Sequence, residues 1–122
     1  MKLTALPILA LSLAGFAVAN DQAACQEKNG NLVKTIQAFC SNQALQVPSS
    51  YASRGATSSD KHSHIYIDGS ACKPAEWIPQ SFCLSQFYNT CANGGAHGGN
   101  VGMMFGNGGC QVFKIQYTKH PL

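Results

Sequence analysis

The chain has 122 residues, of which eight are basic, five are acidic and six are cysteines, and its formal net charge is +3. The basic residues are scattered, and Arg54 is the only arginine, so the sequence lacks the clustered basic stripe of a nucleic-acid-binding protein. A chain of this length forms one small domain with a modest apolar core.

The first 19 residues have the pattern of a secretory signal peptide. A positive charge at Lys2 precedes an apolar run, and Ala17-Val18-Ala19 forms a small-x-small cleavage site before polar residues. The apolar run is shorter than the ~20 residues that a membrane span needs. We therefore expect residues 1–19 to be removed and residues 20–122 to form a single secreted, extracellular domain without stable membrane insertion.

The cysteines predict three disulfides. Their number is even, and all of them follow the signal peptide in a chain directed to an oxidising compartment. They are Cys25, Cys40, Cys72, Cys83, Cys91 and Cys110. Spacing alone leaves fifteen possible pairings.

In the first half of the chain, one helix is expected after a short polar segment. Residues 20–24 are polar and expected to be mobile, and apolar side chains then recur at helical spacing over residues 32–42, with Asn31 as the N-cap. Residues 44–48 predict a short extended piece that ends at a proline. Residues 49–60 are small and polar, which predicts a surface loop.

The second half predicts two strands and one helix. Residues 62–68 and 110–118 alternate as strands do, and residues 79–91 have helical spacing after a turn with two prolines. Glycine-rich loops are expected at 93–100 and 106–109. On the helix, Cys83 and Cys91 can both face the core, which favours a bridge from Cys40 to this helix. The predicted fold is α+β, a small disulfide-stabilised two-layer sandwich with two helices packed on a short antiparallel sheet.

Two patterns suggest a metal site or a catalytic site. His62-x-His64 would place two imidazoles on one face of a strand, but the cysteines that could complete a zinc site are better explained as disulfides, so no metal or other cofactor is expected. Glu76 with a histidine and Arg54 would supply the acid–base groups of a small hydrolase. The string from Glu76 to Pro79 resembles the glutamate-tryptophan-proline segment of fungal guanyl-specific ribonucleases, which makes a secreted ribonuclease-like hydrolase the enzymatic alternative.

The remaining candidates are binding residues. Trp77 stands between two prolines, outside regular structure, and aromatic side chains of this kind are enriched at interfaces. Tyr51 and Arg54 fall in the predicted loop at 48–61, and His97 falls among glycines in the segment 93–109. These two segments are expected to present the contact surface.

Several segments together resemble the small secreted cysteine-rich proteins of filamentous fungi, including effector candidates of plant pathogens. They are the signal peptide, Asn31-Leu32 to Phe39-Cys40, Val47-Pro48-Ser49-Ser50-Tyr51-Ala52, Cys72-x-Pro74-x-x-Trp77-x-Pro79, Gln86-Phe87-Tyr88-x-x-Cys91-Ala92 and Phe105-Gly106-Asn107-Gly108-Gly109-Cys110-Gln111. A weaker similarity is to α/β-sandwich killer toxins, which also set a Gly-Cys turn before a late strand. The resemblance implies a non-enzymatic, monomeric virulence protein that binds a host or extracellular protein or glycan, with a killer or antimicrobial toxin as a further alternative.

Overall fold

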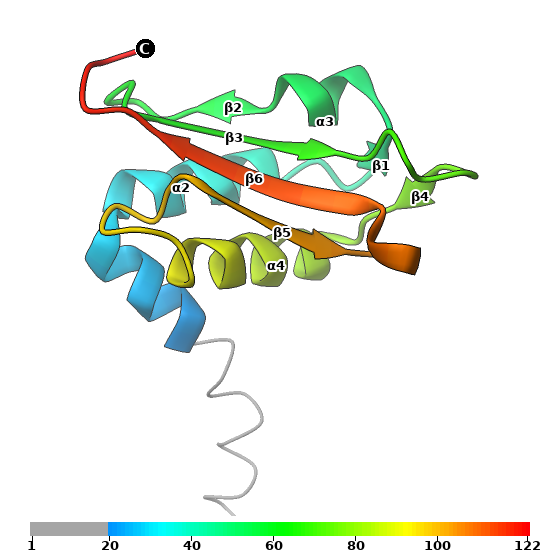
Figure 1. Ribbon diagram of the computed structural model, residues 1–122, viewed down its shortest axis with the longest axis horizontal. Coiled ribbons are helices and arrows are strands. Elements are labelled where there is room, and N and C mark those ends of the chain that lie inside the picture. The colour runs from blue at the N-terminus through cyan, green and yellow to red at the C-terminus, as the bar shows by residue number, and fades with distance from the viewer. Residues whose placement is uncertain (1–19) are drawn as a thin grey trace, which may run out of the picture.

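The computed structural model describes residues 20–122 (Figure 1). The predicted signal peptide, residues 1–19, lies outside the described residues. Helical elements are residues 20–28, α2 (Gly30–Phe39), α3 (Ser50–Arg54), α4 (Gln80–Ala92) and the short 3-10 turn η1 (Asn107–Gly109). Strands are β1 (Gln46–Val47), β2 (Ala56–Thr57), β3 (Ser63–Asp68), β4 (Glu76–Trp77), β5 (Val101–Phe105) and β6 (Gln111–Tyr117).

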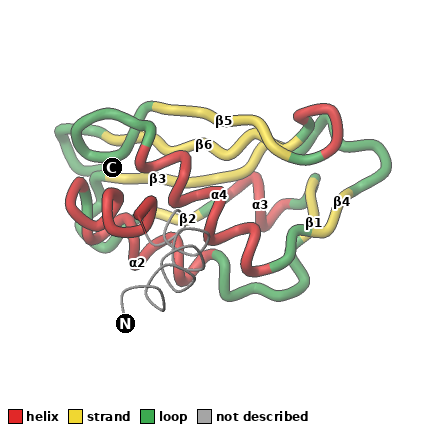
Figure 2. Tube along the Cα trace, turned by 90° about the horizontal axis from the view of Figure 1, so that it is seen from below, coloured by secondary structure: helices red, strands yellow, loops and turns green. Residues whose placement is uncertain are grey.

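The domain has two layers. The main sheet is antiparallel in the order β2-β3-β6-β5, and α2 and α4 pack on one of its faces (Figures 1 and 2). Side chains alternate along β3 and β6, so that Ile65, Ile67, Phe113 and Ile115 are buried beneath the helices. The α+β sandwich predicted from the sequence is therefore confirmed, although residues 20–122 contain four α-helices, a short 3-10 turn and a second, two-stranded sheet of β1 and β4.

Aromatic rings connect the two layers through the core. Phe87 of α4 contacts Phe39 of α2 with ring centroids 5.7 Å apart, and it contacts Phe113 of β6 at 4.7 Å. Phe105 of β5 lies against Phe113 at 5.1 Å. These three pairs are all edge-to-face, the arrangement that the ring quadrupoles favour.

The N-terminal part of the described chain is more helical than its sequence predicts. Residues 20–28 form a helix, so the expectation of a mobile segment at 20–24 is wrong. The N-cap of α2 is Asn29 rather than Asn31, because Asn29 Oδ1 accepts a hydrogen bond from the Leu32 amide at 3.1 Å. Asn31 instead donates its side-chain amide to Asp60 at 3.1 Å. α2 therefore begins earlier than predicted, and it ends at Phe39.

The serine-rich segment expected to be a loop contains regular structure. Ser49 Oγ accepts a hydrogen bond from the Ala52 amide at 3.1 Å, which starts α3, and Ala52 is fully buried. β2 then pairs antiparallel with β3. The turn at 70–79 also differs from expectation, because β4 pairs with β1 despite the neighbouring prolines. The strands predicted at 62–68 and 110–118 and the helix predicted at 79–91 are confirmed within a few residues at each end.

All six cysteines are paired, as the sequence predicts. The bonds are Cys25–Cys91, Cys40–Cys83 and Cys72–Cys110. The second bond is the predicted bridge from Cys40 to α4. Three disulfides in a domain of this size are typical of a small protein stabilised for an oxidising, extracellular environment.

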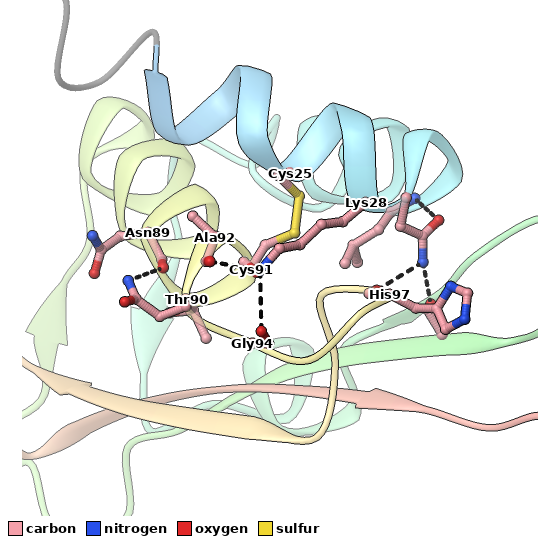
Figure 3. The surroundings of a disulfide bond; sticks show 12 residues. Cys25, Lys28, Asn89, Thr90, Cys91, Ala92, Gly94 and His97 are labelled. Atoms are coloured by element: carbon pink, nitrogen blue, oxygen red, sulfur yellow. Dashed lines mark hydrogen bonds between the residues drawn. A yellow bond between two sulfur atoms is a disulfide. The ribbon is translucent and has the colours of Figure 1, made fainter.

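A lysine reinforces the packing around the first bond. The amino group of Lys28 donates to the carbonyl oxygens of Ala92 at 2.6 Å and Gly94 at 3.0 Å, at the C-terminal end of α4 (Figure 3). It lies 3.5 Å from the carbonyl oxygen of Cys91. The last turn of α4 has no basic residue of its own, so Lys28 supplies the cation that the helix dipole favours there.

Candidate functional site

A pocket at one end of the main sheet is lined by residues of β4, the first half of α4, η1 and the start of β6. Its volume is about 470 Å³, which falls within the ~300–1,000 Å³ range of small-molecule sites. Its lining is Glu76, Trp77, Ile78, Pro79, Phe82, Gln86, Gly106, Asn107 and Gln111. We call this site the Trp77 pocket.

Two large aromatic side chains at the pocket are exposed to solvent. Trp77 is 58% exposed and Phe82 is 55% exposed. The Trp77 ring is held in place, because its Nε1–H donates to the carbonyl oxygen of Gln43 at 2.9 Å and its backbone lies in the β1–β4 pair. The polar edge of the indole is therefore occupied within the protein, whereas more than half of the side chain remains open to a ligand.

The polar side of the pocket is built from a carboxylate and amides. Gln111 Nε2 donates to Glu76 Oε1 at 2.8 Å. Gly106 makes this contact possible, because it has a positive φ of 77° and a Cβ there would lie 2.8 Å from the Gln111 side chain. Gln86 also lines the pocket, and its Oε1 is the one buried side-chain nitrogen or oxygen within residues 20–122 that has no hydrogen-bond partner.

Two disulfides stand directly beside lining residues. Cys110 precedes Gln111 and is bonded to Cys72, so the wall that carries Glu76 is covalently joined to the wall that carries Gln111. Cys83 follows Phe82 and is bonded to Cys40, which fixes the first turn of α4 to the end of α2. A site held in this way is preorganised, because its backbone has few alternatives to adopt when a ligand binds.

Glu76 is the only charged side chain in the pocket lining. Lysine and arginine are absent from that lining, so the pocket has no group to pair with a phosphate or sulfate. The ligand atoms of Cys72, Glu76 and Cys110 lie within 4.8 Å of one another, as a metal site would require. Because the two sulfurs are bonded to each other, neither can become the thiolate that binds a metal.

The structure places the four predicted binding residues in different environments. Trp77 lies in the pocket. Tyr51 is half-buried, stacks on Phe39 with ring centroids 4.9 Å apart, and donates its hydroxyl to the Phe39 carbonyl at 2.7 Å. Burial raises the pKa of the Tyr51 hydroxyl above its ordinary value. Arg54 is exposed at the end of α3. These positions give Tyr51 a packing role between α3 and α2.

His97 lies at the opposite end of the sheet from the pocket, on the loop that follows α4. Its ring stacks on Tyr117 at the end of β6, with centroids 4.2 Å apart, and its backbone carbonyl accepts a hydrogen bond from Asn29 at 3.2 Å. Trp77 and His97 therefore belong to separate surfaces.

The same geometry separates Glu76 from the histidines. Glu76 contacts Gln111 at the start of β6, whereas His62 and His97 stack on Tyr117 at the end of that strand. Six residues of extended strand span about 20 Å. The acid–base pair of a hydrolase must lie within hydrogen-bond reach of one substrate, so Glu76 and these histidines do not form one.

The two histidines of the His62-x-His64 pattern have separate partners. His62 Nδ1 lies 2.8 Å from the Thr118 carbonyl oxygen, and His64 Nδ1 lies 3.0 Å from Thr57 Oγ1. β3 lies between β2 and β6 in the main sheet and contains His64, whereas His62 precedes its first residue.

Trp77 and Glu76 are identified as candidates from the sequence, whereas the other side chains of the pocket are not. Phe82 and Gln86 fall at helical spacing with buried residues of α4, so the pattern predicts that they face the core. Phe82 is instead exposed to solvent and lines the Trp77 pocket. The prolines around Trp77 give the available signal, because they keep this segment out of the main sheet.

Among residues 20–122, no helix is both long and apolar enough to cross a membrane. No protein-family model matches the sequence, and no curated protein or solved structure shows significant similarity to it.

Proposed function

We propose that this protein is a secreted, non-enzymatic interaction protein of the fungal effector type, which binds a host or extracellular target through the Trp77 pocket. The observation that carries the proposal is the exposure of two large aromatic side chains beside one concave, covalently braced site. Tryptophan is among the residues that contribute most to binding energy at interfaces, and phenylalanine is enriched there.

The distribution of exposed apolar groups supports this location. Four large hydrophobic side chains are exposed in the described part of the chain, namely Trp77, Phe82, Met104 and Leu122. Trp77 and Phe82 line the pocket, whereas the other two do not. Isolated exposed apolar residues are normal on a protein surface, whereas two exposed aromatic residues at one pocket support a binding role for this site.

The separation of Glu76 from the histidines favours binding over hydrolysis. A ribonuclease-like reaction through Glu76 needs a second proton-transfer group within reach of the same substrate. The pocket contains none, because its other polar lining groups are amides. We therefore expect purified protein to leave RNA intact. RNA cleavage that disappears in Glu76→Gln would contradict the proposal.

The binding role can be tested by retention on the immobilised mature protein. Plant extracellular fluid and solubilised wall material are passed over wild-type protein and over the Trp77→Ala, Phe82→Ala double variant. Met104→Ala is the matched control, because Met104 is 72% exposed but lies outside the pocket. We expect specific components to be retained by the wild type and the control, and at least about tenfold less by the double variant, a change that corresponds to 1.4 kcal/mol.

Retention that is the same for all three proteins would show that binding, if any, occurs elsewhere. Absence of any retained component would contradict an interaction function for this surface. Growth inhibition of competing microbes by the double variant as well as the wild type would favour the toxin alternative, with a site outside the pocket.

A further inference from the structure

We infer that the ligand of the Trp77 pocket is a neutral sugar, a pyranose unit of an extracellular polysaccharide. The inference rests on the proposed function and narrows it to a ligand class. It follows from three features of the pocket: a fixed aromatic surface, a set of amide groups, and the absence of cationic side chains.

The aromatic surface is suited to the C–H faces of a sugar ring. Because the indole N–H of Trp77 is bonded to Gln43, the exposed part of the side chain is carbon. A pyranose presents aliphatic hydrogens on its ring faces and hydroxyls around its edge. The electron-rich face of an indole attracts such weakly positive hydrogens, and burial of both surfaces removes apolar area from water.

The polar groups match hydroxyls better than they match ions. A hydroxyl donates one hydrogen bond and accepts others, and a side-chain amide likewise does both. Three amides, those of Gln86, Asn107 and Gln111, line the pocket together with one carboxylate. The carboxylate already accepts a hydrogen bond from Gln111, and its second oxygen accepts none from residues 20–122, which leaves it available to a ligand hydroxyl.

Gln86 supplies an independent indication of a ligand. Its buried Oε1 has no partner, and an unpaired buried acceptor is destabilising. The Gln86 side chain lines the pocket. A ligand hydroxyl donating to this oxygen would then complete the hydrogen bonding of the site.

The charge of the lining argues against the other ligand classes. Phosphates, sulfates and acidic sugars need basic partners, which the pocket lining does not contain. A basic side chain would pair with Glu76 and with amide oxygens, but it would offer no acceptor to the amide N–H groups of Gln86 and Asn107. A neutral polyhydroxylated ligand uses all of these groups.

The protein contains its own reporter for the test. Trp77 is the only tryptophan in the chain, so indole fluorescence reports on this pocket alone. The purified mature protein is titrated with soluble oligosaccharides of chitin, cellulose and laminarin, and in parallel with a lysine- and arginine-rich peptide. We expect at least one oligosaccharide to change the emission saturably, with an affinity that is unaffected between about 0.05 and about 0.5 M NaCl, since no ion pair is involved.

Variants identify the contacts by calorimetry, which does not depend on the fluorophore. Trp77→Ala is expected to weaken oligosaccharide binding at least about tenfold, and Trp77→Phe less, because an aromatic surface remains. Gln86→Leu, which keeps the size of the side chain, is expected to weaken binding about fivefold through the loss of a hydrogen bond. Met104→Ala is expected to bind as the wild type does, and thermal unfolding establishes that each variant is folded.

Two results would overturn the inference. One is the absence of binding by every oligosaccharide, and the other is oligosaccharide binding that Trp77→Ala and Gln86→Leu leave unchanged. If the basic peptide alone binds, with an affinity that falls with salt and requires Trp77, the sugar inference fails while the proposed interaction function stands.

Discussion

Lys28 offers a direct test of how the N-terminal helix stabilises the domain. Its amino group donates to two carbonyl oxygens at the end of α4, those of Ala92 and Gly94, although it comes from a different helix (Figure 3). Lys28→Met keeps the aliphatic chain and the helix propensity but removes the charge and the donors. A hydrogen bond to a charged group contributes about 1.5–3 kcal/mol. Lys28 is only half-buried, so water can form hydrogen bonds to the carbonyl oxygens in place of the missing amino group. We therefore expect Lys28→Met to destabilise the domain by about 2 kcal/mol, which is the contribution of one such hydrogen bond rather than two.

The measurement is urea unfolding of the disulfide-intact protein, with thermal unfolding as a second readout. For a domain of this size, about 2 kcal/mol corresponds to a fall in Tm of roughly 8–16 °C. Lys34→Met is the matched control, because Lys34 is exposed on α2. The free energy of unfolding of this variant should differ from that of the wild type by less than about 0.5 kcal/mol. Equal stability of the two variants would refute the role assigned to Lys28.

Three further predictions concern other parts of the fold. Gly98→Ala should destabilise the domain more than Gly108→Ala does, as measured by urea unfolding. Both glycines have a positive φ, but only a Cβ at Gly98 would clash, because it would lie 2.6 Å from the sulfur of Cys91. The Ser58 hydroxyl and further hydrogen bonds hold the pKa of Asp60 below its ordinary value, so its stabilising effect is complete above about pH 4 and lost as the pH falls below this. The stability advantage of wild type over Asp60→Asn should therefore shrink on acidification, and an advantage independent of pH would contradict this account. Replacing both Cys72 and Cys110 by alanine removes a disulfide that joins residues separated by 38 positions in the sequence. We expect the free energy of unfolding, measured in urea, to fall by about 4 kcal/mol. We also expect calorimetry to show weaker ligand binding in the Trp77 pocket. Binding that survives in the folded variant would show that the bridge does not shape the pocket.

Strong periodic patterns account for the elements that sequence reasoning finds. β6 alternates buried and partly exposed residues, and α4 carries buried side chains at helical spacing, so both are predicted nearly to their observed ends. The helix at residues 20–28 lacks such a pattern, since Cys25 is its only fully buried residue. Its stability comes from the bond to Cys91 and from Lys28, which are contacts between distant parts of the chain.

The serine-rich segment shows a second limit of local reasoning. Its composition predicts a loop, yet Ser49 caps α3 and the ring of Tyr51 packs on Phe39. A serine favours either a turn or a helix start, and the tertiary contact of the following residues decides between them. The same limit applies to the candidate site. The sequence indicates Trp77, but only the fold brings Gln86 and Gln111 beside it.

The arrangement of the disulfides determines what a single cut of the backbone can do. The bond between Cys25 and Cys91 spans most of the chain, and the bond between Cys72 and Cys110 overlaps it. Cleavage of any one peptide bond between Cys25 and Cys110 therefore leaves two pieces that remain covalently joined. If a protease cleaves an exposed loop, such as the glycine-rich loop at 93–100, two fragments would separate in gel electrophoresis only after the disulfides are reduced. The nicked molecule would keep both walls of the Trp77 pocket connected.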